Sequence, residues 1–394
     1  MTLPRFLQIH TLHNYPAALL NRDDAGLAKR LPYGDRVRTR ISSQCLKRHW
    51  RTADDAFALK RLEVPMAVRS RETLRLIRDQ LVAAGVTEAQ AQQAAEGLRA
   101  AGLLDKGKDR KGDDALETGQ AVLLGYAEIN YLVQHCKTLA AEHSDEKALK
   151  AAIDGFLKDK KEKKNIEALR LGSGLESALF GRMVTSDVLA SRDAAVYVAH
   201  SFTVHEAQVE NDYFTVVDDL LREAGETGSA GIFDTELASG LYYGYVVVDV
   251  PQLVANLEGV NAGDWARVAP EQRALAGRVV QHLLHLVATV SPGAKRGSTA
   301  PFEWAKFMLV EAGDWQPRSL AGAFQNALPQ NQPALRKAAV ERIADEIAQL
   351  DAAYEAPLAR RYLAVDAAQV PGAQRLALGA LANWAQNAVT RAEA

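Results

Sequence analysis

Apolar and polar residues alternate along two segments near the start of the chain, and this alternation predicts strands. Phe6–His13 (FLQIHTLH) alternates throughout, and Arg36–Ile41 (RVRTRI) alternates arginines with smaller or apolar residues. Ala194–His205 is also strand-like, and Leu241–Val250 (LYYGYVVVDV) is the strongest strand pattern in the chain. We expect these strands to build the core sheet.

A helical period replaces the alternation between about Ala53 and Arg170. Ala, Leu, Glu, Lys and Gln dominate this stretch, and apolar residues recur every three or four positions, which predicts a helical insert. For the last third of the chain we expect a strand at Phe302–Val310 and helices at Arg273–Val290, Arg318–Ala327, Leu335–Leu350 and Ala373–Ala392.

Two charged runs interrupt the helical insert, at Asp105–Asp114 (DKGKDRKGDD) and at Lys158–Lys164 (KDKKEKK). Runs of this kind are typical of solvated loops, and contact with nucleic acid is the alternative interpretation.

The segment Glu206–Gly240 separates two predicted strands and is rich in acidic residues, glycine and serine. Long connections without regular structure are uncommon in compact domains and are usually functional. Because the flanking strands return the chain to one sheet, we interpret this segment as a projecting arm. An apolar cluster at Tyr213, Phe214, Val216 and Val217 could pack against a neighbouring subunit, wedge between bases, or hold the base of the arm together.

The length of 394 residues allows two or three domains with a substantial core. No apolar stretch is long enough to cross a bilayer and the N-terminus lacks signal-peptide features, so we expect a cytoplasmic protein. Cys45 and Cys136 lack the number and spacing of a disulfide framework or a metal site.

Positive charge is concentrated near the N-terminus. Between Arg22 and Arg51 nine lysines or arginines face three aspartates, which is +6; since the whole chain carries -2, the remainder carries -8. A polyanion would therefore meet this protein along a stripe and not over its whole surface.

The stripe has a definite local pattern. On a strand, Arg36, Arg38 and Arg40 would share one face, and Ser42 and Ser43 supply N-cap chemistry for a following helix. A helix N-terminus beside arginines suits phosphate. The alternative is a solvated edge strand whose charges prevent aggregation.

Two short loops add candidate anion contacts. In Gly181-Arg182-Met183 the glycine allows a tight backbone and Arg182 could reach an anion. Ser291–Thr299 (SPGAKRGST) is basic and glycine-rich but lacks the spacing of a nucleotide-hydrolysing phosphate loop, which leaves Lys295 and Arg296 as candidate phosphate contacts.

The sequence lacks the common catalytic and metal-binding motifs. His200 and His205 face opposite ways on a strand, and His282 and His285 share one face of an apolar helix, so we expect each to be a buried structural histidine. An enzyme hypothesis therefore has no residues to support it, and we expect no catalytic residue, cofactor or metal.

Several motifs nevertheless resemble one family, the CasC (Cse-four, Cas-seven) backbone subunit of the type I-E CRISPR Cascade complex. They occur in the family's order and at comparable spacing, and they cover most of the first 310 residues. The motifs are Leu20–Asp24 (LNRDD), Arg36–Arg48 (RVRTRISSQCLKR), Gly181–Met183 (GRM), Tyr213–Leu220 (YFTVVDDL) and Pro292–Ser298 (PGAKRGS).

The resemblance implies an α+β fold built on an RNA-recognition-motif-like (ferredoxin-like) palm. It also implies a helical fingers insertion and a projecting thumb β-hairpin. The corresponding boundaries are 1–52 for the first part of the palm, 53–177 for the fingers, 178–205 for more palm, 206–240 for the thumb, and 241–394 for the last part of the palm with the C-terminal helices.

The implied function is to hold guide crRNA by its backbone, oligomerise along it and present the spacer to target DNA in antiviral defense. Implied partners are crRNA, target DNA through guide pairing, further copies of the chain in a helical filament, and the large, small, cap and processing subunits of Cascade, with no membrane. From the resemblance and the basic residues described above, we expect the following residues to bind RNA: Arg22, Lys29, Arg40, Ser42, Gln44, Lys47, Arg51, Arg182, Met183, Ser186, Lys295 and Arg296. Cys45 departs mildly from the small polar residue common at its position.

Two alternatives come from other classes. A guide-RNA endonuclease would need a general base near the stripe, and His49 is the candidate there. A DNA-binding transcription factor would need an exposed recognition helix and two-fold symmetry.

Overall fold

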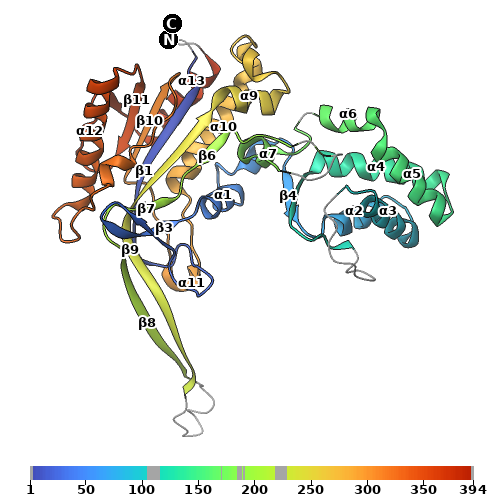
Figure 1. Cartoon of the computed structure of the whole chain (residues 1–394), viewed down its shortest axis with the longest axis horizontal. Helices are drawn as coiled ribbons and strands as arrows, with labels where there is room; N and C mark the ends of the chain where they lie inside the picture. Colours follow the sequence, from blue (N-terminus) through green and yellow to red (C-terminus); the bar gives the residue numbers. More distant parts are fainter. Residues whose placement is uncertain are drawn as a thin grey trace. The chain divides into compact units, whose positions relative to one another are not determined.

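The computed structural model describes residues 3–103, 116–169, 171–183, 189, 191–217 and 229–391. They form two compact units. The first comprises Met1–Leu59, Tyr197–Val248 and Gly277–Ala394, and the second comprises Lys60–Val196 and Asp249–Ala276. Strands dominate the first unit and helices the second (Figure 1). The α+β class expected from the sequence is confirmed.

One sheet of ten strands lies at the centre of the first unit, among the residues that the structure describes. Its path runs β12-β11-β10-β1-β9-β7-β3-β2, and β6 and β8 each pair with β9. The strands are β1 (Phe6–Ala18), β2 (Arg30–Tyr33), β3 (Arg36–Ile41), β6 (Val196–Val198), β7 (Ser201–Thr203), β8 (Gln208–Val217), β9 (Ser229–Asp249), β10 (Phe307–Gly313), β11 (Ala359–Ala364) and β12 (Ala373–Arg375).

Strand β1 is central because it pairs with β10 on one side and β9 on the other. It runs antiparallel to β10, with Phe6 opposite Gly313 and Leu12 opposite Phe307. Residues 6–12 are all buried, as expected of an interior strand covered on both faces. The strands predicted at the N-terminus and at Arg36–Ile41 are thus confirmed.

Helices cover both faces of this sheet (Figure 1). The buried face of α12 packs in one cluster with Leu12, Tyr243 and Phe307. Leu46 of α1 packs on the opposite face with Tyr15 and Tyr242. The helices are α1 (Ser43–Arg51), α11 (Arg296–Thr299), α12 (Leu335–Tyr354), α13 (Leu378–Thr390), the 3-10 turn η4 (Ala321–Phe324), and α10 (Pro270–Thr289), which belongs to the first unit from Gly277 onward.

The segment interpreted as a projecting arm contains the antiparallel pair β8–β9, which extends away from the rest of the sheet (Figure 1). Gln208 lies opposite Ser239 and Phe214 opposite Phe233. Tyr213 and Phe214 are exposed, so these two members of the predicted apolar cluster are not buried in this chain.

The second unit is built from helices around its own apolar core. Leu74, Leu98, Ile129 and Ile153 come from four different helices and are all buried in this core. Its elements are β4 (Ala67–Ser70), α2 (Thr73–Ala83), α3 (Glu88–Ala100), β5 (Val122–Gly125), α4 (Tyr126–Glu142), α5 (Glu146–Lys158), α6 (Lys160–Ala168), α7 (Leu175–Phe180), α9 (Val250–Glu258), and the 3-10 turns η1 (Leu59–Leu62), shared with the first unit, and η3 (Ala262–Asp264).

The prediction that Lys158–Lys164 is a loop is wrong, because most of this run forms helix α6. Asp159 caps the helix by accepting from the backbone N–H of Lys161 at 2.8 Å, and Tyr131 donates to Glu162 at 2.5 Å. The local cap and the contact with α4 stabilise a helix that charge composition alone did not indicate. The other charged run, Asp105–Asp114, lies outside the described residues.

Several boundaries in the last third also differ from those predicted. The strand expected at Phe302–Val310 starts only at Phe307, and the helix expected at Arg318–Ala327 is reduced to the 3-10 turn η4. The first residues of the helix expected at Ala373–Ala392 form the short strand β12 before α13 begins. Parallel pairing with β11, which the helical pattern does not reveal, determines the structure there.

A buried charge network lies beside β1, and no sequence pattern predicts it. Glu311 on β10 accepts from Arg318 Nη2 at 2.9 Å and from Arg360 Nε at 2.6 Å, and His10 Nε2 lies 3.2 Å from its second oxygen. Burial favours the neutral acid, but the hydrogen bonds from His10 and Arg318 outweigh it and hold the pKa of Glu311 well below its usual range. Asp351 pairs with Arg360 and continues the network.

Candidate nucleic-acid interface

Helix α1 begins at the end of β3 because Ser42 caps it. The Ser42 hydroxyl accepts from the backbone N–H of Cys45 at 3.3 Å, and the backbone N–H of Ser42 donates to Asn21 Oδ1 at 2.9 Å. The predicted strand-to-helix turn is confirmed. Since Ser42 is buried and its oxygen is used in the cap, its contribution to an interface is to fix this turn, while its neighbour Gln44 is exposed.

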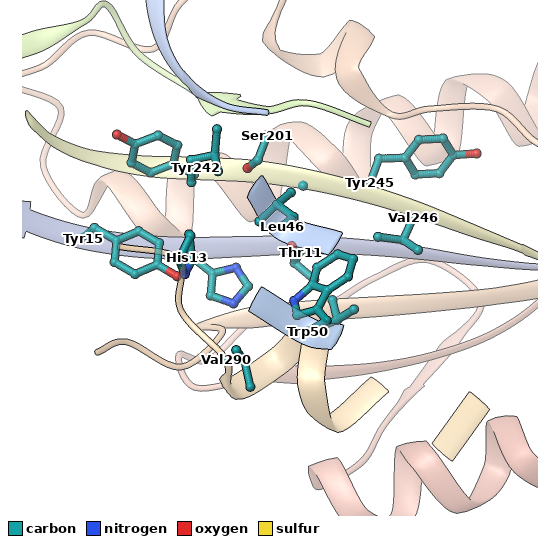
Figure 2. Close-up of a pocket in the computed structure, with 14 residues that line it drawn as sticks. Thr11, His13, Tyr15, Leu46, Trp50, Ser201, Tyr242, Tyr245, Val246 and Val290 are labelled. Atoms are coloured by element: carbon teal, nitrogen blue, oxygen red, sulfur yellow. The ribbon is translucent and has the colours of Figure 1, made fainter. Parts of the chain in front are cut away.

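The apolar side of α1 anchors the helix to the sheet. Leu46 and Trp50 point toward Thr11 and His13 of β1 around a cavity of about 30 Å³ (Figure 2). This volume is far below that of ligand pockets, which measure roughly 300–1,000 Å³, and matches one or two water molecules. The cavity is therefore a packing feature, and the outward side of α1 is the surface of interest.

Lys47 and Arg51 lie one turn apart on α1, at positions that share a side of the helix. Both are half-buried. Burial lowers the pKa of Lys47, because a less solvated site disfavours the ammonium form. An anion at this position would favour the charged form again, which suits a phosphate.

Arg22 and Lys29 are carried by a tight loop next to α1. An isolated bridge joins Arg22 to Ala28, and the backbone N–H of Lys29 donates to Asn21 O at 2.9 Å. Arg22 is exposed and Lys29 half-buried. Because Asn21 also binds Ser42, this loop and the start of α1 form one hydrogen-bonded assembly.

The expectation of three arginines on one exposed face of β3 is wrong for Arg38. Its side chain is 0% exposed, and it donates to the carbonyls of Thr203 at 3.1 Å and Phe324 at 3.0 Å. Arg38 therefore joins β3 to β7 and to η4, and only Arg36 and Arg40 retain exposed surface. The hydrogen-bonded partners come from distant parts of the chain, which the period-two pattern could not reveal.

Arg40 on β3 contacts His200, which immediately precedes the neighbouring strand β7. Its Nη1 lies 2.9 Å from His200 Nδ1, and its Nε donates to Arg30 O at 3.2 Å. Partial desolvation, followed by the nearby charges of Arg40 and Lys29, lowers the pKa of His200, so the neutral ring accepts from the guanidinium. His200 is exposed, which makes the prediction of a buried histidine wrong here, whereas His205 is buried as predicted.

The glycine-rich loop places Lys295 and Arg296 near α1, since Arg296 lowers the pKa of His49 electrostatically, after the larger effect of burial. Both basic side chains are exposed. Lys295 Nζ hydrogen-bonds Thr235 on β9 and lies 5.9 Å from the centre of the Phe214 ring, a cation–π distance. Lys295 thus contacts the hairpin in this structure, and Arg296 is the better candidate for an anion.

Arg182 and Met183, in the second unit, differ sharply in the exposure of their side chains. The Arg182 side chain is 2% exposed and pairs with Glu128 through both terminal nitrogens, at 2.6 and 2.8 Å, so the expectation that it reaches an anion is not supported. Met183 is 95% exposed and stays a candidate contact. Gly181 has φ +78°, and a side-chain carbon at this position would approach Arg192 O to 3.1 Å, which confirms the predicted tight backbone. Ser186 lies outside the described residues.

Two contributors to this surface were not predicted from the sequence, Thr235 and Glu236 at the base of the hairpin. Glu236 accepts from the backbone N–H of Ala28 at 2.8 Å and binds the Arg30 guanidinium. No motif marks these positions, because Glu236 lies 208 residues from Ala28 and Thr235 lies 60 residues from Lys295.

Two further observations concern the whole described part of the chain. Among those residues no group of three or more His, Cys, Asp and Glu side chains is placed to hold a metal ion. None of the helices found there has the length and apolar character needed to cross a membrane.

The fold and this surface define a class: an α+β protein in which a sheet edge, a capped helix and two loops place cations together, as suits a polyanion. The chain belongs to the family described as CT1975-like protein (Cas_CT1975), which matches residues 7–387. Comparison with curated proteins gives no match.

Two solved structures are similar over nearly the whole chain. A chain of a "CRISPR RNA-guided surveillance complex, pre-nicking" has a TM-score of 0.77 and 26% identity, with 98% of this chain and 100% of that chain covered. A chain of a "CRISPR RNA-guided surveillance complex" has a TM-score of 0.56 and 21% identity, covering 97% and 99%, a likeness of fold alone.

Proposed function

We propose that this protein is the backbone subunit of a type I-E CRISPR Cascade surveillance complex. In this role it binds the phosphate backbone of guide crRNA without reading sequence, oligomerises along the RNA and presents the spacer for pairing with target DNA. The observation that carries the proposal is the similarity, at a TM-score of 0.77 and full coverage of the other chain, to a chain of an RNA-guided surveillance complex.

The composition of the surface supports backbone recognition. A subunit that accepts any guide must contact phosphates and sugars and leave base edges free for pairing. Gln44, Lys47 and Arg51 on α1, with Arg22 on the adjacent loop, are side chains of the type that contacts phosphate. Arg296 adds a further cation from the glycine-rich loop.

The five motifs that resemble the CasC family support the type I-E assignment. In this proposal the first unit contains the RNA-recognition-motif-like palm, the helical unit contains the fingers, and β8–β9 is the thumb. The sheet supports the palm assignment, since β1 lies between β9 and β10, as the first strand of a ferredoxin-like sheet lies between two later strands.

The remaining partners follow from the same role. Further copies stack along the RNA, and the exposed Tyr213 and Phe214 on β8 offer the thumb an apolar surface for a neighbour or a nucleotide. Large, small, cap and processing subunits complete the complex. A cytoplasmic location accords with guide RNA and target DNA as partners.

The test is to purify the protein expressed with a CRISPR array and to examine the nucleic acid that co-purifies. We expect RNA of uniform length, retained in particles larger than one chain on gel filtration. RNA-free protein, or a dimer that prefers duplex DNA, would contradict the proposal and favour a transcription factor.

We further propose that the chain binds guide RNA and does not cleave it. His49 Nδ1 lies 2.8 Å from Cys45 O. Burial lowers the His49 pKa, and hydrogen bonds to the backbone of Cys45 and, to a smaller extent, of Gly293 raise it again in part. These contacts are typical of a histidine that joins α1 to the glycine-rich loop. Discrete cleavage of precursor RNA by the wild type that is lost in His49→Ala would overturn this part of the proposal.

A further inference from the structure

Two consecutive residues at the base of the hairpin hold the two basic loops of the candidate interface. Thr235 and Glu236 lie next to each other on β9, so their side chains point to opposite faces of the strand. Thr235 binds Lys295 of the glycine-rich loop, and Glu236 binds Ala28 and Arg30 at the end of the Arg22–Lys29 loop. The strand therefore contacts one basic loop through each face.

The contacts of Glu236 satisfy both of its oxygens. Oε1 accepts from the backbone N–H of Ala28 at 2.8 Å, and Oε2 binds Arg30 Nη2. The Glu236 side chain is 6% exposed and that of Arg30 36%. A carboxylate this buried next to cations is unusual for a surface meant to attract phosphate, because its negative charge opposes the ligand.

Glu236 also lies at one end of a continuous hydrogen-bonded path to α1. Ala28 is bridged to Arg22, Lys29 donates to Asn21 O, and Asn21 Oδ1 accepts from the backbone N–H of Ser42. Orienting Ala28 thus orients the loop that carries Arg22 and Lys29 against the N-terminus of α1.

We propose that Glu236 and Thr235 are positioning residues: they hold the two basic loops in the geometry that grips the RNA backbone, without touching the RNA. This inference rests on the proposed function, and it assigns a positioning role in RNA binding to two buried residues of the hairpin base whose side chains contact the basic loops.

The substitution Glu236→Gln separates two explanations, because a pure net-charge effect and a positioning role predict opposite changes in RNA affinity. Removal of a negative charge beside phosphate contacts should by itself strengthen RNA binding. Glutamine keeps one acceptor oxygen and turns an NH2 group toward the second donor, so it cannot satisfy both the Ala28 N–H and the Arg30 guanidinium. The loop loses part of its anchor, and binding should weaken by about fivefold, since a charge-assisted hydrogen bond disappears. We expect weakening. Glu210→Gln, on the exposed part of β8, removes the same charge from the same hairpin and should not weaken binding.

Thr235→Val supplies a second variant that keeps the shape and β-branching of the side chain, so folding is preserved even where Glu236→Gln is poorly tolerated. It removes the acceptor for Lys295 while leaving every charge in place. We expect about threefold weaker RNA binding, because the loop bearing Arg296 loses an anchor. A pure net-charge effect predicts no change in RNA affinity for this variant.

The experiment combines two measurements on the full chain. Hydrogen exchange of the Ala28 and Lys29 amides in RNA-free protein reports the anchoring, and titration of a labelled single-stranded RNA of mixed sequence over a salt series reports its consequence. Faster exchange together with weaker binding and a shallower salt dependence in Glu236→Gln supports the inference. A purely structural role would lower thermal stability without changing the salt dependence.

The outcomes separate this inference from the function on which it rests. If the wild type binds RNA and Glu236→Gln binds it equally or more tightly, positioning is overturned and the proposed function stands. If the wild type fails to bind RNA at all, the proposed function fails and this inference fails with it. Unchanged exchange at both Ala28 and Lys29, together with unchanged RNA binding in Glu236→Gln, overturns the anchoring.

Discussion

Arg182 and Glu128 form a buried two-point contact, with Nη1 2.6 Å from Oε2 and Nη2 2.8 Å from Oε1. Their side chains are 2% and 4% exposed, although the two residues are 54 positions apart. Glu128 also accepts from the backbone N–H of Gly125 at 3.1 Å, so the pair connects the start of α4 to the segment after α7.

We expect Arg182→Ala to destabilise the second unit by about 3–5 kcal/mol, because it leaves the Glu128 carboxylate buried without its cation. Met183→Ala, at the adjacent exposed position, should change stability by less than about 0.5 kcal/mol. Thermal unfolding of both variants measures the difference. Equal stability of the two variants would show that the ion pair is not the origin of the effect.

Lys47→Ala combined with Arg51→Ala should weaken RNA binding to the same extent for unrelated guide sequences. Removing one phosphate contact lowers the salt-dependence slope by about 0.7 for a single strand, so the slope of the double variant should fall by about 1.4. Binding titrations with two guides at several salt concentrations measure both quantities. Loss of one guide with retention of the other would contradict backbone recognition.

Alanine substitutions of Arg38 and Arg36 should have different effects on the free energy of unfolding, although the two residues lie only two positions apart on β3. Arg38→Ala leaves the carbonyls of Thr203 and Phe324 without their donor and opens a cavity, and we expect the free energy of unfolding to fall by about 3 kcal/mol. Arg36→Ala, at an exposed position, should stay within about 0.5 kcal/mol of the wild type. Urea denaturation gives both values, and a large effect of Arg36→Ala would contradict this division of roles.

The first unit should lose stability on acidification. Burial lowers the pKa of His10, and it lowers the pKa of His13 to about 4; Glu311 also has a folded-state pKa below its usual value. For groups whose pKa is lower in the folded state, the stabilisation is present above the unfolded pKa and is lost as the pH falls. The free energy of unfolding should therefore decline below about pH 6.5, and decline further below about pH 4.3.

Urea denaturation at a series of pH values measures this dependence. His10→Asn should flatten the decline between the ordinary histidine range and the carboxylate range. Glu311→Gln should destabilise at every pH, because Arg318 and Arg360 lose their shared partner. Stability that rises on acidification of the wild type would contradict the assigned pKa directions.

Local patterns in the sequence predicted the elements that carry the interface. Period-two alternation gives β1 and β3, and two serines before a helical period give the cap of α1, because these features depend on neighbouring residues. The tight backbone at Gly181 was predictable for the same reason, since the freedom of glycine to adopt positive φ is a property of the residue itself.

Local patterns could not predict which charged side chains are exposed to solvent and which are paired inside the protein. Whether an arginine meets solvent or a carboxylate depends on partners that only the fold brings together, as Glu128 does for Arg182 and Glu311 for Arg360. The charged run that forms α6 is stabilised in part by Tyr131 from another helix, a contact that no local pattern contains. The positions of Thr235 and Glu236 follow from the strand pairing of the hairpin, which is again a long-range property.

The unbroken length of β9 has a mechanical consequence. Its 21 residues span roughly 70 Å at about 3.3 Å per residue, and one continuous backbone runs from the hairpin to Tyr243, whose hydroxyl lies 2.9 Å from His10 in the core. The hairpin is therefore a direct extension of a central strand of the sheet, and no separate hinge segment joins β9 of the hairpin to β9 of the core. In the proposed filament, a force on the hairpin would be resisted by the bending stiffness of the sheet, so the spacing between copies would follow from the elasticity of the core.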